Sequence, residues 1–442
     1  MTTTSPLFIP TPPVHYLPGQ LTALPADHVS KPTTRYLVTF IFCKMSHPQF
    51  TSVKENAGQL QARKRALFSL FDRIGLELEI PSGRYQEANT RYKSVSDWLQ
   101  DCPDLGKLNP NIFPQGSFAL GTTVRPLHGD EYDLDFIGHL EAANPTRYTQ
   151  QQVYDMFFRR LREHGTYADM IELKKRCVRV RYANEFHLDI TPAVTNPVCL
   201  VSSLLVPDRK HKEWKPSHPK GYADWFNLIA NLQPRFSALA KSPTAGRHVT
   251  LASTEPLPAQ RVSKEVLRRA IQVMKRHRDV YAENNPESAE FVPISIIITT
   301  LAAKAYELAV SMQEYDSEFD LLHITIGLMP KFLEGPDLRG FYRVTNPTNV
   351  GENFADKWQR PQYYHTFIGW HQNLQHDLKH LEKLAGTDAL RKSLRGTLGA
   401  REVERVFDRE IAAVTRARPQ QQVLVTTAAA AIQMRPNTFF GR

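Results

Sequence analysis

Apolar residues recur at helical spacing over long stretches near both ends of the chain. Between Lys54 and Leu78 this spacing predicts one long helix. Its apolar positions are Leu60, Leu67, Leu70, Phe71 and Ile74. A second helix is predicted from Ser82 to Leu99, because Pro103 closes the pattern. Helical patterns dominate again from about residue 263 onward.

The middle of the chain alternates apolar and polar residues with a period of two, the pattern of half-buried strands. Strands are predicted at 132–140 and 177–191, with a turn at 183–185 dividing the second. Residues 112–117 have the pattern of a strand, a turn and a helix start. This order predicts an α+β fold, with a mixed sheet core, flanking helices and a C-terminal helical bundle.

Composition suggests where the parts of the chain begin and end. The first 44 residues hold seven prolines and no helical periodicity, so we expect an extension that is disordered or not native, and translation from Met45 stays open. The predicted parts are 1–44 as this extension, 45–233 as the sheet core with its N-terminal helix, 234–262 as a linker, 263–415 as a helical lobe and 416–442 as a basic tail.

Charge and cysteine content narrow the class of protein. The 442 residues carry 55 Lys and Arg against 45 Asp and Glu, a net charge of +10 that suggests phosphate-bearing partners. Residues 1–44 hold a net +2 and those after Glu410 a net +4, which leaves +4 for residues 45–410, so a broad nucleic-acid surface is not required. Four scattered cysteines and the lack of a 20-residue apolar run predict a cytoplasmic protein without a membrane span.

Three aspartates on two predicted strands are the candidate catalytic and metal-binding residues. Residues i and i+2 of a strand share a face, so Asp133 and Asp135 lie side by side while Leu134 faces the core. The alternation of the 186–190 strand puts Asp189 on its polar face. If the two strands pair, three carboxylates gather at a site that suits Mg²⁺ or Mn²⁺ and an in-line phosphoryl displacement.

A phosphate site is expected beside these carboxylates. Gly116 lets the backbone approach a ligand closely, and Ser117 offers a hydroxyl at a helix start. Lys275, in a basic cluster of the 263–281 helix, and Ser295, at the next helix start, are further candidates. Alone, a Gly-Ser pair is a turn, two nearby aspartates are a solvated strand edge, and a basic cluster is a solvated helix face; it is their combination that points to chemistry.

Together these residues resemble the cGAS/DncV-like nucleotidyltransferases (CD-NTases) of bacterial CBASS antiphage systems, in the polymerase-β-type superfamily. The resemblance runs from about Met45 to Trp358. It is carried by Arg91-Tyr-Lys-Ser94, Phe113-Pro-Gln-Gly-Ser-Phe-Ala-Leu-Gly-Thr122, Arg125-Pro126, Asp130-Glu-Tyr-Asp-Leu-Asp135, His187-Leu-Asp-Ile-Thr-Pro192, Lys275-Arg-His-Arg-Asp279, Ser295-Ile-Ile-Ile-Thr-Thr-Leu301 and Asn353-Phe-Ala-Asp-Lys-Trp358.

The resemblance implies a bilobed enzyme that joins nucleoside triphosphates, ATP among them, into a cyclic di- or trinucleotide and releases pyrophosphate. It assigns Asp133 and Asp135 to both magnesium ions, and Asp189 to the ion that activates the acceptor hydroxyl. It assigns the donor triphosphate to Gln115, Gly116 and Ser117, with Lys275 and Ser295 as contacts from the helical lobe. The partners it implies are a nucleotide-activated effector and ancillary CBASS proteins. Animal relatives carry a zinc-binding insertion for which this chain has no His/Cys cluster, so activation by nucleic acid is not expected.

Two other functions fit the same residues. The first is a transferase on the same core that makes linear oligonucleotides, tails RNA or adds a nucleotide to another molecule, because a fold does not fix the acceptor. The second is a basic RNA-binding protein with decayed catalysis, against which the three intact aspartates argue.

Overall fold

The computed structural model describes residues 57–128, 131–182, 186–198, 203–209, 212–237, 264–384, 386–417, 424–427 and 430–433. The predicted extension 1–44 and nearly all of the predicted linker 234–262 lie outside these residues. The first helices follow the apolar spacing of the sequence closely. They are α1 (Ala57–Leu78), α2 (Ser82–Gln100) and the short α3 (Pro103–Gly106).

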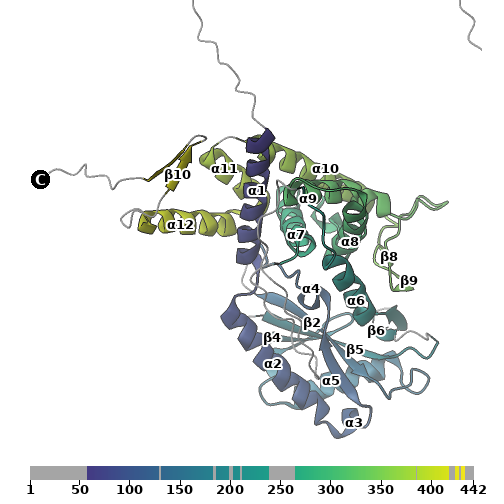
Figure 1. Ribbon diagram of the computed structural model, residues 1–442. Helices are drawn as coiled ribbons and strands as arrows, with labels where there is room; N and C mark the ends of the chain where they lie inside the picture. The colour runs from purple at the N-terminus through teal and green to yellow at the C-terminus, as the bar shows by residue number, and fades with distance from the viewer. Residues whose placement is uncertain are drawn as a thin grey trace, which may run out of the picture. The chain divides into compact units, whose positions relative to one another are not determined.

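A seven-stranded mixed sheet forms the lower part of the molecule in Figure 1. Its strands are β1 (Pro110–Pro114), β2 (Tyr132–Leu140), β3 (Ile171–Leu173), β4 (Val178–Tyr182), β5 (Phe186–Thr195), β6 (Leu204–Asp208) and β7 (Glu213–Ser217). The order is β1-β2-β5-β4-β3, and β6 pairs with both β5 and β7. Strands β2 and β5 run parallel, and the other pairs are antiparallel. Helix α4 (Gly116–Ala119) follows β1 directly.

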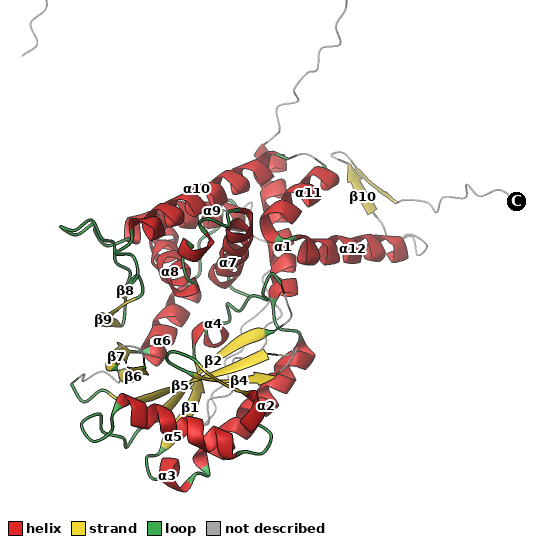
Figure 2. Cartoon of the chain, turned by 180° about the vertical axis from the view of Figure 1, so that it is seen from behind, coloured by secondary structure: helices red, strands yellow, loops and turns green. Residues whose placement is uncertain are grey.

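One face of the sheet is covered by helices and holds its own apolar core. Helices α2 and α5 (Gln150–Glu163) pack on this face (Figure 2). Leu134 and Phe136 of β2 and Leu188 and Ile190 of β5 meet Phe157 of α5 there, and all five are buried. This leaves the polar positions of the same strands on the opposite face, toward α4 and the helical lobe (Figure 2).

The second core belongs to the helical lobe. It is built from α6 (Pro219–Ala230), α7 (Val266–Asn284), α8 (Ser295–Met312), α9 (Glu318–Leu328), α10 (Pro361–Lys383), α11 (Thr387–Leu398) and α12 (Ala400–Ala417). The 3-10 turns η1 (Ala168–Met170), η3 (Ala289–Phe291) and η4 (Met329–Phe332), the hairpin of β8 (Thr345–Asn346) and β9 (Asn349–Asn353), and the pair of β10 (Leu424–Thr427) and β11 (Ala430–Gln433) complete the described elements.

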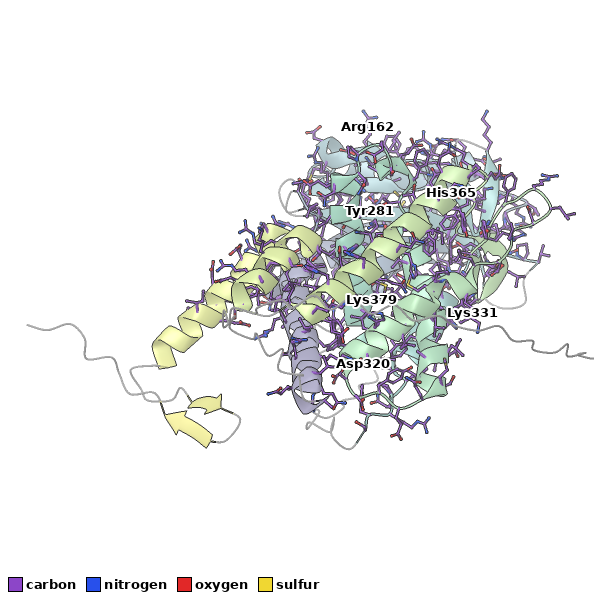
Figure 3. All side chains as sticks on the ribbon, turned by 90° about the horizontal axis from the view of Figure 1, so that it is seen from above. Arg162, Tyr281, Asp320, Lys331, His365 and Lys379 are labelled. Atoms are coloured by element: carbon purple, nitrogen blue, oxygen red, sulfur yellow. The ribbon has the colours of Figure 1, made fainter. Side chains whose placement is uncertain are left out.

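Helices α1 and α6 lie within the range predicted as the sheet core but pack into the helical lobe. Phe71 and Ile74 of α1 and Phe226 of α6 join its apolar core. Lys64 of α1 also contacts Asp320 of α9 at 2.6 Å, and Asp320 lies beside α1 in Figure 3. Contacts between segments distant in sequence thus join α1, the predicted N-terminal helix, and α6 to the core of the helical lobe.

Helix α8 is the one described helix long and apolar enough to cross a membrane by length and composition. In this structure Ile297, Ile298 and Leu301 of α8 are fully buried against the other helices of the lobe. A helix surrounded by other helices is apolar on most sides, which explains its composition.

Candidate active site

The pairing of β2 and β5 brings the three predicted aspartates together. Asp135 and Asp189 are direct neighbours in the parallel register, and Asp133 lies two residues before Asp135 on the same face. Asp189 is buried, with 7% of its surface exposed, whereas the Asp133 side chain is 62% exposed. The three carboxylates thus share one face of adjacent strands and differ in exposure, with Asp133 the most exposed.

Asp135 is the aspartate whose proton affinity is most disturbed. Burial, followed by the negative charges of Asp189 and Asp133, raises its pKa from 3.8 to about 7. Arg179 and Lys275 oppose this shift only in part. Near neutral pH the site therefore carries carboxylates that repel each other, and a cation placed among them relieves that cost.

Arg179 of β4 supplies positive charge at the site and was missed by the sequence analysis. Its Nε and Nη2 donate to the two Asp189 oxygens at 2.6 and 2.8 Å, and Nη2 also donates to Asp133 at 3.0 Å. These hydrogen bonds raise the pKa of Arg179 further above its already high value. A signal was present, because Val178 and Val180 are buried and Arg179, between them, must face the aspartates.

The turn after β1 sets Gly116 against the carboxylates. The Gln115 N–H donates to the carbonyl of Asp135 at 2.8 Å, and the Gln115 side chain reaches Thr191 of β5. Gly116 has φ of +62°, and a Cβ there would come within 2.8 Å of an Asp135 oxygen. Only glycine fits such a position without strain. Ser117 follows at the start of α4 and is partly exposed.

Side chains on helix α7 and just before it hydrogen-bond the segment that follows α4. They donate to five backbone carbonyls in the segment 120–125. The bonds run from Arg268 to Leu120 (2.9 Å), Lys264 just before α7 to Gly121 (2.6 Å), Lys275 to Thr122 (3.1 Å), Gln272 to Thr123 (2.9 Å) and Arg276 to Arg125 (2.8 Å). We call this set the α7 clamp. It fixes the chain directly after Gly116 and Ser117.

Lys275 therefore binds protein groups in this structure. Its ammonium donates to both the carbonyl and the hydroxyl of Thr122, and 3% of the residue is exposed. Burial, with the nearby Arg278 charge, lowers its pKa from 10.5 to about 7. The alternative that these basic residues form a solvated helix face is wrong, since Arg268, Lys275 and Arg276 are all buried.

Ser295, the first residue of α8, makes its hydrogen bonds within the helical lobe. Its hydroxyl accepts from Arg278 at 3.4 Å, and its carbonyl accepts from Thr299 at 2.8 Å. These contacts lie within the helical lobe, so the bonds around Ser295 do not join it to the aspartates.

The donor set fits a divalent cation. Among the described residues no group of three or more His, Cys, Asp or Glu side chains is arranged as a ready metal centre. The Arg179 guanidinium instead lies between Asp133 and Asp189, where it supplies positive charge. Carboxylate oxygens are the ligands that Mg²⁺ prefers. The raised pKa of Asp135 reflects burial and then repulsion from Asp189 and Asp133, and a cation among these carboxylates would relieve that repulsion.

A parallel pair of strands with carboxylates in register, next to a Gly-Ser turn, defines a nucleotidyltransferase core. Residues 67–229 match the family described as the Second Messenger Oligonucleotide or Dinucleotide Synthetase domain. The chain belongs to the cGAS/DncV-like nucleotidyltransferases (CD-NTases) of CBASS systems, and its activity is that of a cyclic oligonucleotide synthase.

Two curated relatives extend this match over most of the chain. The c-di-GMP synthase of Roseivirga ehrenbergii is 31% identical over 372 residues, which cover 82% of this chain and 94% of that protein. The cyclic dinucleotide synthase CdnG of Bradyrhizobium diazoefficiens is 25% identical over 361 residues, covering 75% and 80%.

Solved structures share the fold. The structure of Bradyrhizobium diazoefficiens CdnG in complex with GTP superposes with a TM-score of 0.59 and 21% identity, covering 77% of this chain and 98% of that one. E. coli MS115-1 CdnC with ATP gives a TM-score of 0.54 at 12% identity, covering 78% and 98%. These likenesses confirm the predicted α+β architecture of sheet core and helical lobe.

Proposed function

We propose that this enzyme is a magnesium-dependent, cytoplasmic synthase that condenses two GTP molecules into cyclic di-GMP. The observation that carries the choice of product is the 31% identity, over 82% of the chain, to a protein named c-di-GMP synthase. The shared face of Asp133, Asp135 and Asp189 supports the chemistry. The proposed role of the product is to activate an effector protein in antiphage defence.

Each condensation step transfers one nucleotidyl group. A ribose hydroxyl oxygen of the acceptor forms a bond to the α-phosphorus of the donor, the bond between the α-phosphorus and the bridging oxygen breaks, and pyrophosphate leaves. We propose that Asp189, the most buried of the three carboxylates, faces the acceptor hydroxyl and takes part in removing its proton. Two such steps, the second within one linear molecule, close the ring.

Asp133, Asp135 and Asp189 would hold magnesium, which would supply positive charge to acidify the attacking hydroxyl and to stabilise the transferring phosphoryl group. Among the residues of this chain, Arg179 contacts two of the three carboxylates directly. Since Arg179 contacts Asp133 and Asp189 through one side of its guanidinium, its release leaves a cation at the site for a substrate phosphate.

The donor triphosphate is proposed to lie against Gln115, Gly116 and Ser117. The absence of a side chain at Gly116 leaves room next to Asp135, and Ser117, the next residue, is partly exposed. Lys275 and Ser295 remain proposed phosphate contacts from the helical lobe. To contact a phosphate, the Lys275 ammonium must leave Thr122. Ser295 is already partly exposed.

The test is product identification. The protein is incubated with all four nucleoside triphosphates and Mg²⁺ or Mn²⁺, treated with phosphatase and analysed by mass spectrometry. We expect phosphatase-resistant cyclic di-GMP, none with Asp189→Asn, and a wild-type yield with the control Asp155→Asn, since Asp155 lies on α5 across the sheet. Cyclic products without guanine would overturn the choice of GTP, and linear products that never cyclise would favour an RNA-tailing or oligoadenylate-type transferase.

A further inference from the structure

Two strand ends meet beside the proposed active site and gather basic residues there. Strands β4 and β6 both pair with β5, β4 alongside its first half and β6 alongside its last residues, so the start of β4 meets the end of β6. The N–H of Arg209 donates to the carbonyl of Lys175 at 3.2 Å and ties these ends together. The group formed by Lys174, Lys175, Arg176 and Arg209 is called the basic turn below.

The basic turn directly precedes two residues that contact the aspartates, Cys177 and Arg179. Cys177, the residue after it, hydrogen-bonds Asp189 through its thiol. Arg179, two residues further on, binds Asp189 and Asp133. Three residues span at most about 10 Å of chain, so Arg176 begins within that distance of the backbone at Arg179.

Two cations of the basic turn, Lys175 and Arg176, have half-exposed side chains. Lys175 and Arg176, whose side chains are 46% and 42% exposed, share one fully buried carboxylate, Asp208, at 3.0 and 3.3 Å. Lys174 pairs with Glu172 at 2.6 Å. Arg176 also lies near the charge of the buried Glu352, and Arg209 lies over the Tyr154 ring of α5. The solvent-exposed ends of Lys175 and Arg176 are therefore the ones that can contact a further anion.

The geometry of in-line transfer indicates which anion would reach the basic turn. The attacking oxygen approaches the α-phosphorus from the side opposite the leaving pyrophosphate. If the donor triphosphate lies against Gly116 and Ser117, at the β2 side of the aspartates, the acceptor nucleotide enters over β5 and β4. In the first condensation the acceptor keeps its own triphosphate, since only the donor loses pyrophosphate.

We propose that the basic turn binds the 5′-triphosphate of the acceptor nucleotide during the first condensation; this inference rests on the function proposed above. The second condensation differs, because the triphosphate of the linear intermediate then serves as donor and moves to Gly116 and Ser117. The acceptor end of the intermediate then carries only a phosphodiester. The basic turn therefore acts on formation of the linear intermediate and not on ring closure.

The experiment separates these two steps with defined nucleotides. 2′,3′-Dideoxy-GTP serves as a donor that cannot act as acceptor, and GTP or GMP serves as acceptor, with the mixed linear dinucleotides quantified by mass spectrometry. Ring closure is measured separately on supplied linear pppGpG. The wild type should use GTP as acceptor more efficiently than GMP by about tenfold or more, the scale of one charge-assisted hydrogen bond.

The test variant is Lys175→Gln/Arg176→Gln, which removes two cations but keeps hydrogen-bonding side chains. Because this leaves Asp208 buried without a cation, a second variant adds Asp208→Asn. The matched control is Arg159→Ala/Arg162→Ala, which removes two cations from α5 on the other face of the sheet (Arg162 is labelled in Figure 3).

We expect both basic-turn variants to lose the preference for GTP over GMP, with ring closure at the wild-type rate, while the control behaves as wild type. Variants that keep the preference, or that slow ring closure as much as the first step, would overturn the proposal. A wild type that forms no dinucleotide from any of these substrates would instead overturn the proposed function itself.

Discussion

Helix α7 and the sheet face that carries the aspartates both hold buried charged side chains, but the surroundings of these charges differ. On α7, buried Arg268, Lys275 and Arg276 each donate to a backbone carbonyl. On the sheet, burial and then the like charges of Asp189 and Asp133 raise the pKa of Asp135 to about 7. Buried cations that bind backbone carbonyls hold a segment in place, whereas carboxylates that repel each other mark the place where a ligand is needed.

The largest effect should come from Asp135→Asn, which removes one of the three carboxylates that repel each other. Product formation should fall by about a thousandfold or more, the scale seen when a member of a catalytic set is lost. Thermal unfolding should occur at the same or a higher temperature, because repulsion with Asp133 and Asp189 disappears. A clear loss of stability would show that Asp135 is a structural charge like those of α7.

The converse change is Arg276→Met on α7. Arg276 is fully buried, binds the Arg125 carbonyl and lies 3.7 Å from the buried Glu402 of α12. Its loss leaves the Arg125 carbonyl without this donor and Glu402 with Arg401 alone, at 2.8 Å. The free energy of unfolding should fall by about 2 kcal/mol, measured by urea titration. The double variant Arg276→Met/Glu402→Gln should recover part of that loss. If it recovers none, the carbonyl bond matters more than the ion pair.

The pH dependence of stability should distinguish the two regions. Asp135, with its pKa raised from 3.8 to about 7, keeps its proton longer when folded, so its contribution to stability falls as pH rises from about 4 to 7. Lys275, lowered from 10.5 to about 7, loses its proton first when folded, so its contribution rises between pH 7 and 10.5. Unfolding curves of Asp135→Asn and Lys275→Met, each subtracted from wild type, should show these two opposite slopes.

The smallest effect is expected from Ser295→Ala. If the Ser295 hydroxyl contacts a triphosphate, its loss should raise KM for GTP by about tenfold or less, with little change in kcat or in stability. Thr299→Val, one turn along α8, serves as the control because its hydroxyl bonds the Ser295 carbonyl. Equal KM values for both variants and wild type would remove Ser295 from the site.

The same comparison shows what the sequence can reveal. Asp133, Asp135 and Asp189 could be placed on one face because strand alternation is local and their strands are clearly apolar on the other face. Arg179 follows from that alternation and was overlooked. The α7 clamp was out of reach, since the partners of its side chains are carbonyls, which every residue carries. The packing of α1 and α6 against the helical lobe was likewise out of reach, because it depends on contacts between segments distant in sequence.

The backbone oxygens that the α7 clamp binds also determine which positions of the chain tolerate substitution. Because the clamp holds main-chain oxygens, the side chains at positions such as Thr123 contribute little to the grip itself. A library that randomises Thr123 should retain many active members, whereas one that randomises Gln272, its donor, should retain few. The donors on α7 should therefore tolerate fewer substitutions than Thr123, whose carbonyl one of them binds.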